Sequence, residues 1–269
     1  MKKLLFFFIL LLNFDILYCQ NLSDTSNVTK NEGAAGDDPS QFFTRIELFN
    51  ELQHFPTDTY LDQTTLRINI KIGKRFTTRL DIPFVYNSLS SPEEYNHFGL
   101  GDISLRLLGY QILQSKKSAL TASIELGFNT AQNPILGTGK NMIIPMLTFS
   151  RMLKNHKTIL SFIFQQAQSF GGHPERMTLS YSKLQAVFIQ IWTRKLWTVV
   201  APEAYIDYVN GGLSMNFEAR CAYAPTRRIN VWAQAGAGLF GDFIARYQWG
   251  AEIGCRYYLL RNIFFKKKH

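Results

Sequence analysis

The chain has no long apolar run beyond its first 19 residues, although 46% of its residues are hydrophobic. No later stretch approaches the ~18–20 uninterrupted apolar residues of a membrane-spanning helix, which excludes a helical membrane protein. Residues 1–19 combine Lys2 and Lys3 with an apolar run over 4–12, which predicts a signal peptide cleaved after Cys19. A lipoprotein lipidated at Cys19 is the alternative, and the bulky Tyr18 before it opposes that interpretation.

Cysteine and histidine are scarce, with three cysteines and five histidines in 269 residues. Cys221 and Cys255 fall on the apolar faces of predicted strands that are not neighbours, so we expect two free, lipid-facing thiols and no disulfide. No Cys-x-x-Cys pair or Cys/His metal spacing is present. The histidines lie in predicted loops or at the end of the chain. The sequence therefore predicts no metal site and no cofactor.

Positive charge is not gathered on any one element. The formal net charge of +9 and the pI of about 9.4 would fit a nucleic-acid-binding protein. The cations are instead spread over short turns and a basic tail at residues 261–269, and an exported chain would rarely meet nucleic acid. We therefore expect no nucleic-acid partner.

Short basic connections alternate with longer, neutral to acidic ones along the chain. The short ones are 73–75, 114–117, 154–157, 193–195 and 225–228, and the longer ones lie near 54–61, 87–98, 130–140, 168–176, 208–212 and 239–242. Tight periplasmic turns, longer outer loops and strands between them are typical of an outer-membrane barrel. The basic turns are expected either to rest against anionic head groups of the inner leaflet or to be solvated turn residues.

The segments between these connections alternate apolar and polar residues. In 64–72, Leu66, Ile68 and Ile70 share one face, and Arg67 lies on the other. The predicted strands are 42–53, 64–72, 75–84, 102–107, 120–129, 141–152, 157–167, 178–191, 196–207, 213–221, 229–238 and 246–256. Segments 141–152 and 178–191 are ambiguous because they are apolar on both faces. We predict an all-β chain forming an antiparallel, up-and-down transmembrane barrel of about twelve strands over 42–260.

A soluble barrel or sandwich would alternate in the same way. Aromatic residues near the strand ends, such as Trp192 and Trp197, are typical of the interfacial belts of membrane proteins and favour the membrane barrel. Polar faces then point to the lumen. The charged positions predicted to face it are Arg67, Lys71, Arg79, Asp81, Asp102, Arg106, Glu125, Glu218, Arg220, Arg246, Glu252 and Arg256. Their cations and anions nearly balance, which predicts weak charge selectivity.

Residues 20–41 are dominated by Asn, Ser, Thr, Asp, Gly and Glu. That composition predicts a flexible polar segment ahead of the barrel. The alternative is a plug that folds into the lumen.

The stretch Arg79–Phe84, a loop, and Phe98–Ile103, followed by a strand, a loop with spaced glycines and Pro145, resembles one group of barrels. That group is the outer-membrane proteins labelled as transporters of a meta-pathway for phenol degradation (MetA-type). The resemblance covers roughly residues 65–150 and departs at Asn129–Ala131, where such proteins often have a Pro-Thr-Gly turn. It implies an outer-membrane barrel that passes small, often aromatic or apolar molecules.

These observations predict a non-enzymatic channel in the outer membrane of a Gram-negative-type cell, in contact with outer-membrane lipids. Two alternatives stay open. One is a lipid acyl hydrolase, for which His173 with Ser169 in the same loop is the best pair available. The other is a closed structural barrel without transport. The sequence leaves the solute and the oligomeric state open.

Overall fold

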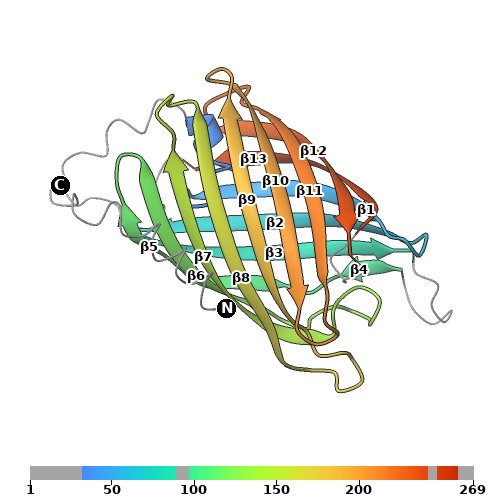
Figure 1. Ribbon diagram of the computed structural model, residues 1–269. Helices are drawn as coiled ribbons and strands as arrows, with labels where there is room; N and C mark the ends of the chain where they lie inside the picture. Colours follow the sequence, from blue (N-terminus) through green and yellow to red (C-terminus); the bar gives the residue numbers. More distant parts are fainter. Residues whose placement is uncertain (1–31, 89–96, 242–246, 260–269) are drawn as a thin grey trace. The chain divides into compact units, whose positions relative to one another are not determined.

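The computed structural model describes residues 32–88, 97–241 and 247–259 of the chain. They form one sheet that closes on itself as an antiparallel barrel (Figure 1), preceded by the short helix α2 (Glu32–Ala35). The strands are β1 (Arg45–His54), β2 (Tyr60–Ile72), β3 (Phe76–Asn87), β4 (Phe98–Leu100), β5 (Ser104–Gln114), β6 (Ser118–Gly127), β7 (Lys140–Met152), β8 (Thr158–Gly172), β9 (Ser180–Ile191), β10 (Leu196–Asp207), β11 (Leu213–Tyr223), β12 (Ile229–Phe240) and β13 (Trp249–Tyr258). Among these residues, no helix is long and apolar enough to cross a membrane. The expected signal peptide at 1–19 and basic tail at 261–269 lie outside the described residues.

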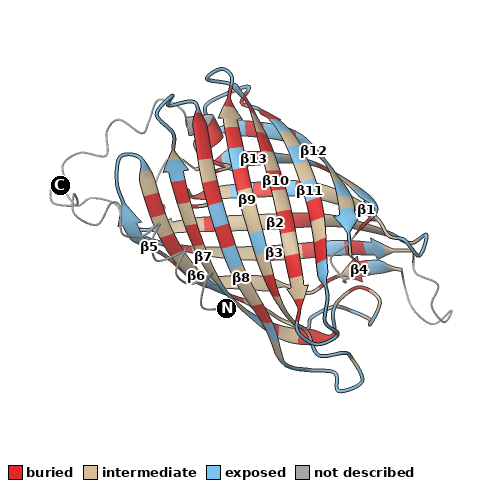
Figure 2. Cartoon of the chain, in the orientation of Figure 1, coloured by how far each residue is buried: buried red, intermediate tan, exposed pale blue. Residues whose placement is uncertain are grey.

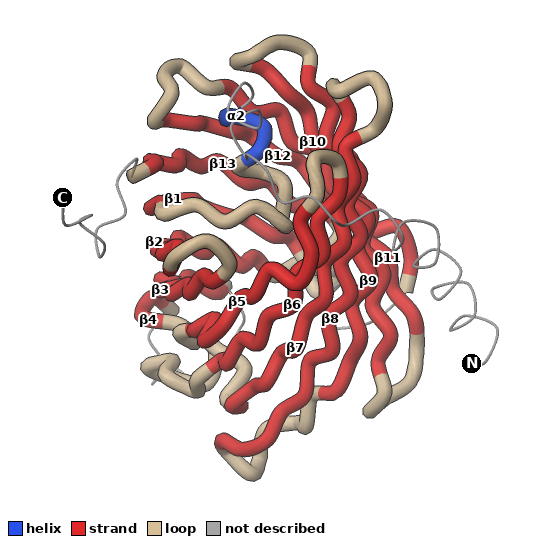
Figure 3. Tube along the Cα trace, turned by 90° about the vertical axis from the view of Figure 1, so that its left-hand side faces the viewer, coloured by secondary structure: helices blue, strands red, loops and turns tan. Residues whose placement is uncertain are grey.

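Strand β1 closes the ring. It pairs antiparallel with β2 on one side and with β13 on the other, from Arg45 opposite Tyr258 to His54 opposite Trp249. Figure 3 shows β1 between these two strands. The short β4 and the longer β5 both pair with β3, so together they fill one position in the wall. The ring therefore has twelve positions, which confirms the predicted twelve-stranded, up-and-down barrel.

The two ends of the barrel differ in their connections. At one end lie the short turns 73–75, 115–117, 153–157, 192–195 and 224–228, together with the start of β1 and the end of β13. At the other end lie the longer loops, including 128–139 between β6 and β7 and 173–179 between β8 and β9. The short connections are those that the sequence predicted as basic periplasmic turns.

Apolar side chains cover the outside of the wall, whereas the inside carries the buried charged side chains and, on β8, β9 and β10, a cluster of apolar ones. In β1, Ile46 and Leu48 are 38% and 49% exposed, whereas Glu47 between them is 2% exposed. In β13, Ile253 is 64% exposed and the adjacent Glu252 only 9%. Figure 2 shows this alternation as bands along the strands. A soluble barrel would show the opposite arrangement, so the exterior of this one is suited to lipid.

Strand β5 is the least regular part of the wall. Its pairing with β6 shifts register between Arg106 and Leu108 and again between Gln111 and Leu113. Each β-bulge adds one residue to the strand without a partner opposite. As a result, Leu107 and Leu108 are both exposed. The bulges keep the apolar residues of β5 outside and the Arg106 side chain inside.

Candidate functional site

Residues 34–41 lie inside the barrel, at the end that carries the short turns. Ala34 packs in the apolar cluster that contains Trp197 of β10. Asp38 receives a hydrogen bond from Ser150 of β7. The same segment also contacts β11 and β13, which lie on the other side of the ring from β7. Only a segment within the lumen can reach all four strands.

The sequence offered two interpretations of residues 20–41, a flexible lead-in or a plug. Residues 20–31 lie outside the described residues. For residues 34–41, the interior contacts and the burial of Asp38 and Ser40 favour the plug. How far a plug extends toward residue 20 stays a prediction.

Asp37 holds this segment to the barrel wall. Its carboxylate forms ion pairs with Arg220 of β11 at 3.2 Å and Arg256 of β13 at 3.1 Å. The indole Nε1 of Trp197 donates a hydrogen bond of 2.5 Å to the other carboxylate oxygen. Burial alone would raise the pKa of Asp37, but Arg256, Arg220 and the indole hold it below its usual range. The carboxylate is therefore charged and bound at neutral pH.

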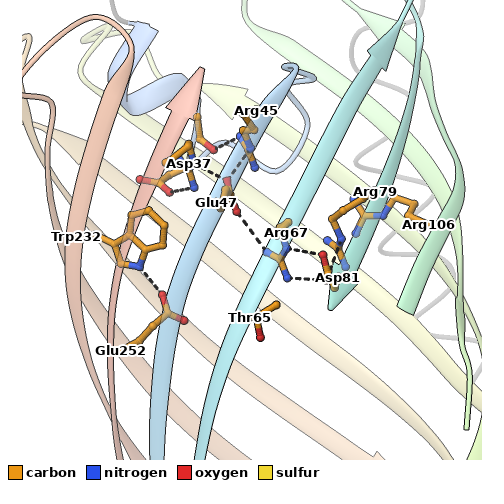
Figure 4. Close-up of polar contacts among 12 residues, drawn as sticks. Asp37, Arg45, Glu47, Thr65, Arg67, Arg79, Asp81, Arg106, Trp232 and Glu252 are labelled. Carbon is orange, nitrogen blue, oxygen red and sulfur yellow. Dashed lines mark hydrogen bonds and ion pairs between the residues drawn. The ribbon is translucent and has the colours of Figure 1, made fainter. Parts of the chain in front are cut away.

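A continuous ion-pair network runs along the inner face of the wall from β13 to β6. Figure 4 shows its central part, from Glu47 through Arg67 and Asp81. Glu47 lies at its centre, paired with Arg45 at 2.7 Å, Arg256 at 2.5 Å and Arg67 at 3.7 Å. Arg67 binds both carboxylate oxygens of Asp81, each at 2.9 Å. Because a buried charge without a partner is costly, this pairing is what allows arginines to line a narrow lumen.

The network continues through β3, β5 and β6. Arg79 pairs with Asp81 at 3.2 Å and with Glu125 at 2.5 Å. Arg106 also pairs with Glu125, at 3.4 Å. The arginines on these strands thus share carboxylates, because Arg79 and Arg106 both pair with Glu125.

A second polar group lines β11, β12 and β13. Arg220 pairs with Glu252 at 2.9 Å and donates to the amide oxygen of Gln234 at 2.8 Å. The Trp232 indole also donates to Glu252. Glu218 accepts one hydrogen bond from Gln234, at 2.9 Å, and a second of the same length from the Tyr247 hydroxyl. Asp37 connects this group to the Glu47 network through Arg220 and Arg256.

The structure places most of the predicted lumen residues within these two groups. Lys71 is an exception, because it forms no ion pair with a described residue. Asp102 is a second exception, because its carboxylate binds the loop 128–139. Arg246 lies outside the described residues. The residues in the two groups are Arg67, Arg79, Asp81, Arg106, Glu125, Glu218, Arg220, Glu252 and Arg256. A role for any of them in solute passage stays a prediction.

Asp102 anchors the loop 128–139 at the outer end. Its Oδ1 accepts hydrogen bonds from the backbone N–H groups of Thr130 and Ala131, each at 3.2 Å. Its Oδ2 accepts from the backbone N–H and the hydroxyl of Thr138, at 2.6 and 2.8 Å. Both oxygens are thus used to fold the loop, which distinguishes Asp102 from a solvated lumen charge.

Arg176 joins the second outer loop, 173–179, to the first. Its guanidinium donates to the carbonyl oxygens of Pro134, Gly137 and Thr138 at 2.8, 2.9 and 3.2 Å. The Lys140 ammonium adds a bond of 2.7 Å to the His173 carbonyl. The two loops therefore form one connected cover at the outer mouth.

A cavity of about 740 Å³ lies inside the barrel beneath this cover. Its wall comes from β1, β2, β3 and β5, and its roof from 135–138 and 175–179. The apolar side chains that line it include Phe49, Leu61, Pro83, Val85, Leu136 and Leu179. The polar ones include Gln63, Thr65, Arg67, Asp81 and Ser104. The main charges on the β2–β3 wall, Arg67 and Asp81, are already paired with each other.

Some interior residues were not singled out from the sequence. Glu47 and Arg45 belong to the predicted strand 42–53, where their alternation with Ile46 and Leu48 carried the signal. Lys183 pairs with Glu203 at 2.7 Å, but it lies in 178–191, whose two apolar faces hid its orientation. No local pattern could have found Asp37, because its arginine partners are 183 and 219 residues away.

Ser169 and His173, the pair considered for an acyl hydrolase, contact other residues of their loop region. The Ser169 hydroxyl accepts a hydrogen bond from the Leu179 backbone N–H at 3.0 Å, and the His173 ring lies 3.3 Å from Glu175. No hydrogen bond joins Ser169 to His173 in the described part of the chain. Within the described ranges, no three His, Cys, Asp or Glu side chains are grouped to hold a metal ion.

The two cysteines in the described part of the chain lie on the outer face of the barrel. Cys221 of β11 and Cys255 of β13 are free and exposed, and β12 lies between their strands. This confirms the expected pair of unbridged thiols.

Neither a family model nor any curated protein sequence matches the chain. Solved structures do match. The COG4313 outer membrane channel from Pseudomonas putida F1 has a TM-score of 0.67 at 12% identity, covering 81% of this chain and 96% of that one. The NanC porin has a TM-score of 0.60 at 7% identity, covering 80% of this chain and 100% of that one. A KdgM porin in complex with disordered oligogalacturonate has a TM-score of 0.55 at 9% identity, covering 80% of this chain and 99% of that one.

Identities this low show the fold alone. The neighbours are outer-membrane channels and porins, which confirms the coarser part of the resemblance seen at residues 65–150. The specific transporter family is not confirmed. The closed ring, the apolar exterior and the structural neighbours together show that this chain is a twelve-stranded antiparallel β-barrel with the fold of outer-membrane channels and porins.

Proposed function

We propose that the barrel is a passive outer-membrane channel for small neutral, apolar or aromatic solutes, without catalysis or a cofactor. The observation that carries the proposal is the 740 Å³ cavity beneath the outer loops. Its size falls in the range of cavities that hold small organic molecules, roughly 300–1,000 Å³. Its lining offers apolar contact surface and hydroxyl or amide groups, as a neutral amphipathic solute would require.

The pairing of the interior charges supports a neutral solute. Arg67 is held by Asp81 and Glu47, so little of its charge is available to attract an anion. An anionic solute would also have to give up its hydration in the interior, which is costly where the arginine of the cavity wall is already paired. A neutral solute avoids that cost.

Liposome influx tests the proposal. Two neutral solutes that differ by one aromatic ring, glucose and phenyl glucoside, should both enter proteoliposomes faster than protein-free vesicles. If the apolar lining contributes, phenyl glucoside enters at a higher rate relative to its size. If neither solute enters and planar bilayers show no conductance, the closed structural barrel replaces this proposal.

A matched pair of variants locates the path. Thr65 is 2% exposed and lines the cavity (Figure 4), whereas Thr64 is on the outer face of the same strand. Thr65→Phe adds a ring inside the cavity and should slow influx, while Thr64→Phe places the same ring against lipid. Equal rates in the two variants would show that solutes do not pass through this cavity.

A further inference from the structure

The five short turns carry a regular pattern of charge that the channel proposal does not explain. Each turn between β2 and β3, β5 and β6, β7 and β8, β9 and β10, and β11 and β12 contains two cations and no carboxylate. We call these ten side chains the basic ring. They are Lys74, Arg75, Lys116, Lys117, Lys154, Lys157, Arg194, Lys195, Arg227 and Arg228.

The basic ring has no carboxylate partners within the protein. All ten residues are exposed, and none forms an ion pair with a described residue. This contrasts with the interior, where the arginines of the Glu47 network share carboxylates. A ring of unpaired like charges repels itself, so its free energy falls when an external anion binds.

The ring lies at the depth of lipid head groups. Exposed aromatic residues stand directly beside the turns, among them Phe76, Trp192 and Tyr257. Such aromatic side chains mark the boundary between hydrocarbon and head groups. Arg228 donates a hydrogen bond to the hydroxyl of Tyr257 at 3.5 Å, and Arg75 makes the same contact with Tyr110 at 3.4 Å. These contacts hold two guanidinium groups against the belt.

The described loops at the opposite end lack this pattern. Lys140 and Arg176 bind carbonyl oxygens of the loop cover. Asp58 and Glu175 place carboxylates at that end, near His54 and His173. Unpaired positive charge is therefore concentrated at the short-turn end.

We propose that the basic ring binds the phosphate groups of anionic phospholipids in the periplasmic leaflet of the outer membrane. Lysine supplies a compact point charge for a phosphate, and arginine can bind two phosphate oxygens at once. Five turns spaced around the circumference would each contact a different lipid. The ring thus fixes the depth of the barrel and keeps an anionic lipid shell at its inner end.

Lipid selectivity measures this binding directly. The protein is reconstituted in phosphatidylcholine vesicles with a trace of spin-labelled phosphatidylglycerol or spin-labelled phosphatidylcholine, and the immobilised fraction of each is compared. One cation in contact with an anionic head group raises the occupancy of that lipid beside the protein about fivefold. We expect phosphatidylglycerol to be preferred by about that factor at 0.01 M ionic strength. At 1 M, where the screening length is about 3 Å, the preference should fall toward one. Equal immobilisation at low salt would overturn the proposal.

Variants assign the preference to the ring. Replacing all ten cations with Gln should abolish it. If that variant fails to insert, Lys116→Gln with Lys117→Gln should lower the preference in part, whereas Lys116→Arg with Lys117→Arg should retain it. Neutralising Asp58 and Glu175 at the other end is the matched control and should change nothing.

A cell-wall contact is the competing occupant of this surface. Purified peptidoglycan sacculi are sedimented with the detergent-solubilised protein, and the bound fraction is measured. Binding to sacculi without any preference for phosphatidylglycerol would assign the ring to the cell wall and refute the lipid proposal. Loss of the preference leaves the channel proposal intact, because solute influx is measured separately.

Discussion

Asp37→Asn should release the N-terminal segment from the short-turn end of the barrel. The substitution keeps the shape of the side chain and removes the charge that binds Arg220 and Arg256. Removing one partner of a buried ion pair costs about 3–5 kcal/mol. Here each arginine keeps a second carboxylate, Glu252 or Glu47, so the expected loss lies at the lower end, about 3 kcal/mol.

A loss of about 3 kcal/mol shifts the balance between docked and released segment by roughly two orders of magnitude. Single-channel recording in planar bilayers measures the result as a larger conductance or a larger open fraction. The control is Asp38→Asn, at the next residue, whose carboxylate accepts hydrogen bonds from Ser40 and Ser150 and pairs with no arginine. An unchanged conductance in Asp37→Asn, or an equal gain in Asp38→Asn, would refute the view that the Asp37 ion pairs hold the segment in place.

Three further outcomes follow from the same structure. The first is the pH dependence of the conductance, measured in the Asp38→Asn background. Burial raises the pKa of Asp38, so that this carboxyl would respond to pH with the opposite sign to Asp37. The pKa of Asp37 is lowered on docking, so its contribution is fully present above the ordinary carboxyl pKa of about 3.9. It is lost as the pH falls through the lowered pKa of the docked state. Conductance should therefore stay constant from pH 7 to about 4 and rise only below that, and a rise near neutral pH would contradict the assignment. Leu66→Arg, on the lipid face midway along β2, should lower the free energy of unfolding by about 2–4 kcal/mol in vesicles, whereas Ile72→Arg at the end of the strand should cost about 0–1 kcal/mol. Equal losses would place the bilayer elsewhere on the barrel. Asp102→Ala removes four hydrogen bonds from loop 128–139, so its backbone amides should exchange with solvent at least tenfold faster while those of β6 do not change.

The sequence by itself determined the wall of the barrel. Alternation such as Leu66, Arg67 and Ile68 assigns each residue of a strand to lipid or lumen, because a shift by one residue would move every charge to the wrong side. Turns such as Gly73–Arg75 mark where one strand ends and the next begins. These signals are local, so the twelve strands and the apolar exterior could be predicted from them. They failed to show orientation where both faces are apolar, as around Val187–Ile189, and there Lys183 went unnoticed. They also failed at Trp197, which was predicted to lie in an aromatic belt, whereas its indole is buried in the interior and donates to Asp37.

Only the tertiary structure decided what the interior does. Asp37 meets Arg256 across 219 residues of chain, a contact that depends on the closure of the ring and has no local signature. The sequence alternation places Asp102 on the lumen face, yet both of its carboxylate oxygens accept hydrogen bonds from the loop 128–139. Glu47 forms ion pairs with three arginines, which lie on β1, β2 and β13. Periodicity shows which side of the wall a side chain leaves from. Its partner depends on strand register and on the closure of β1 against β13, which places Glu47 opposite both Arg67 and Arg256.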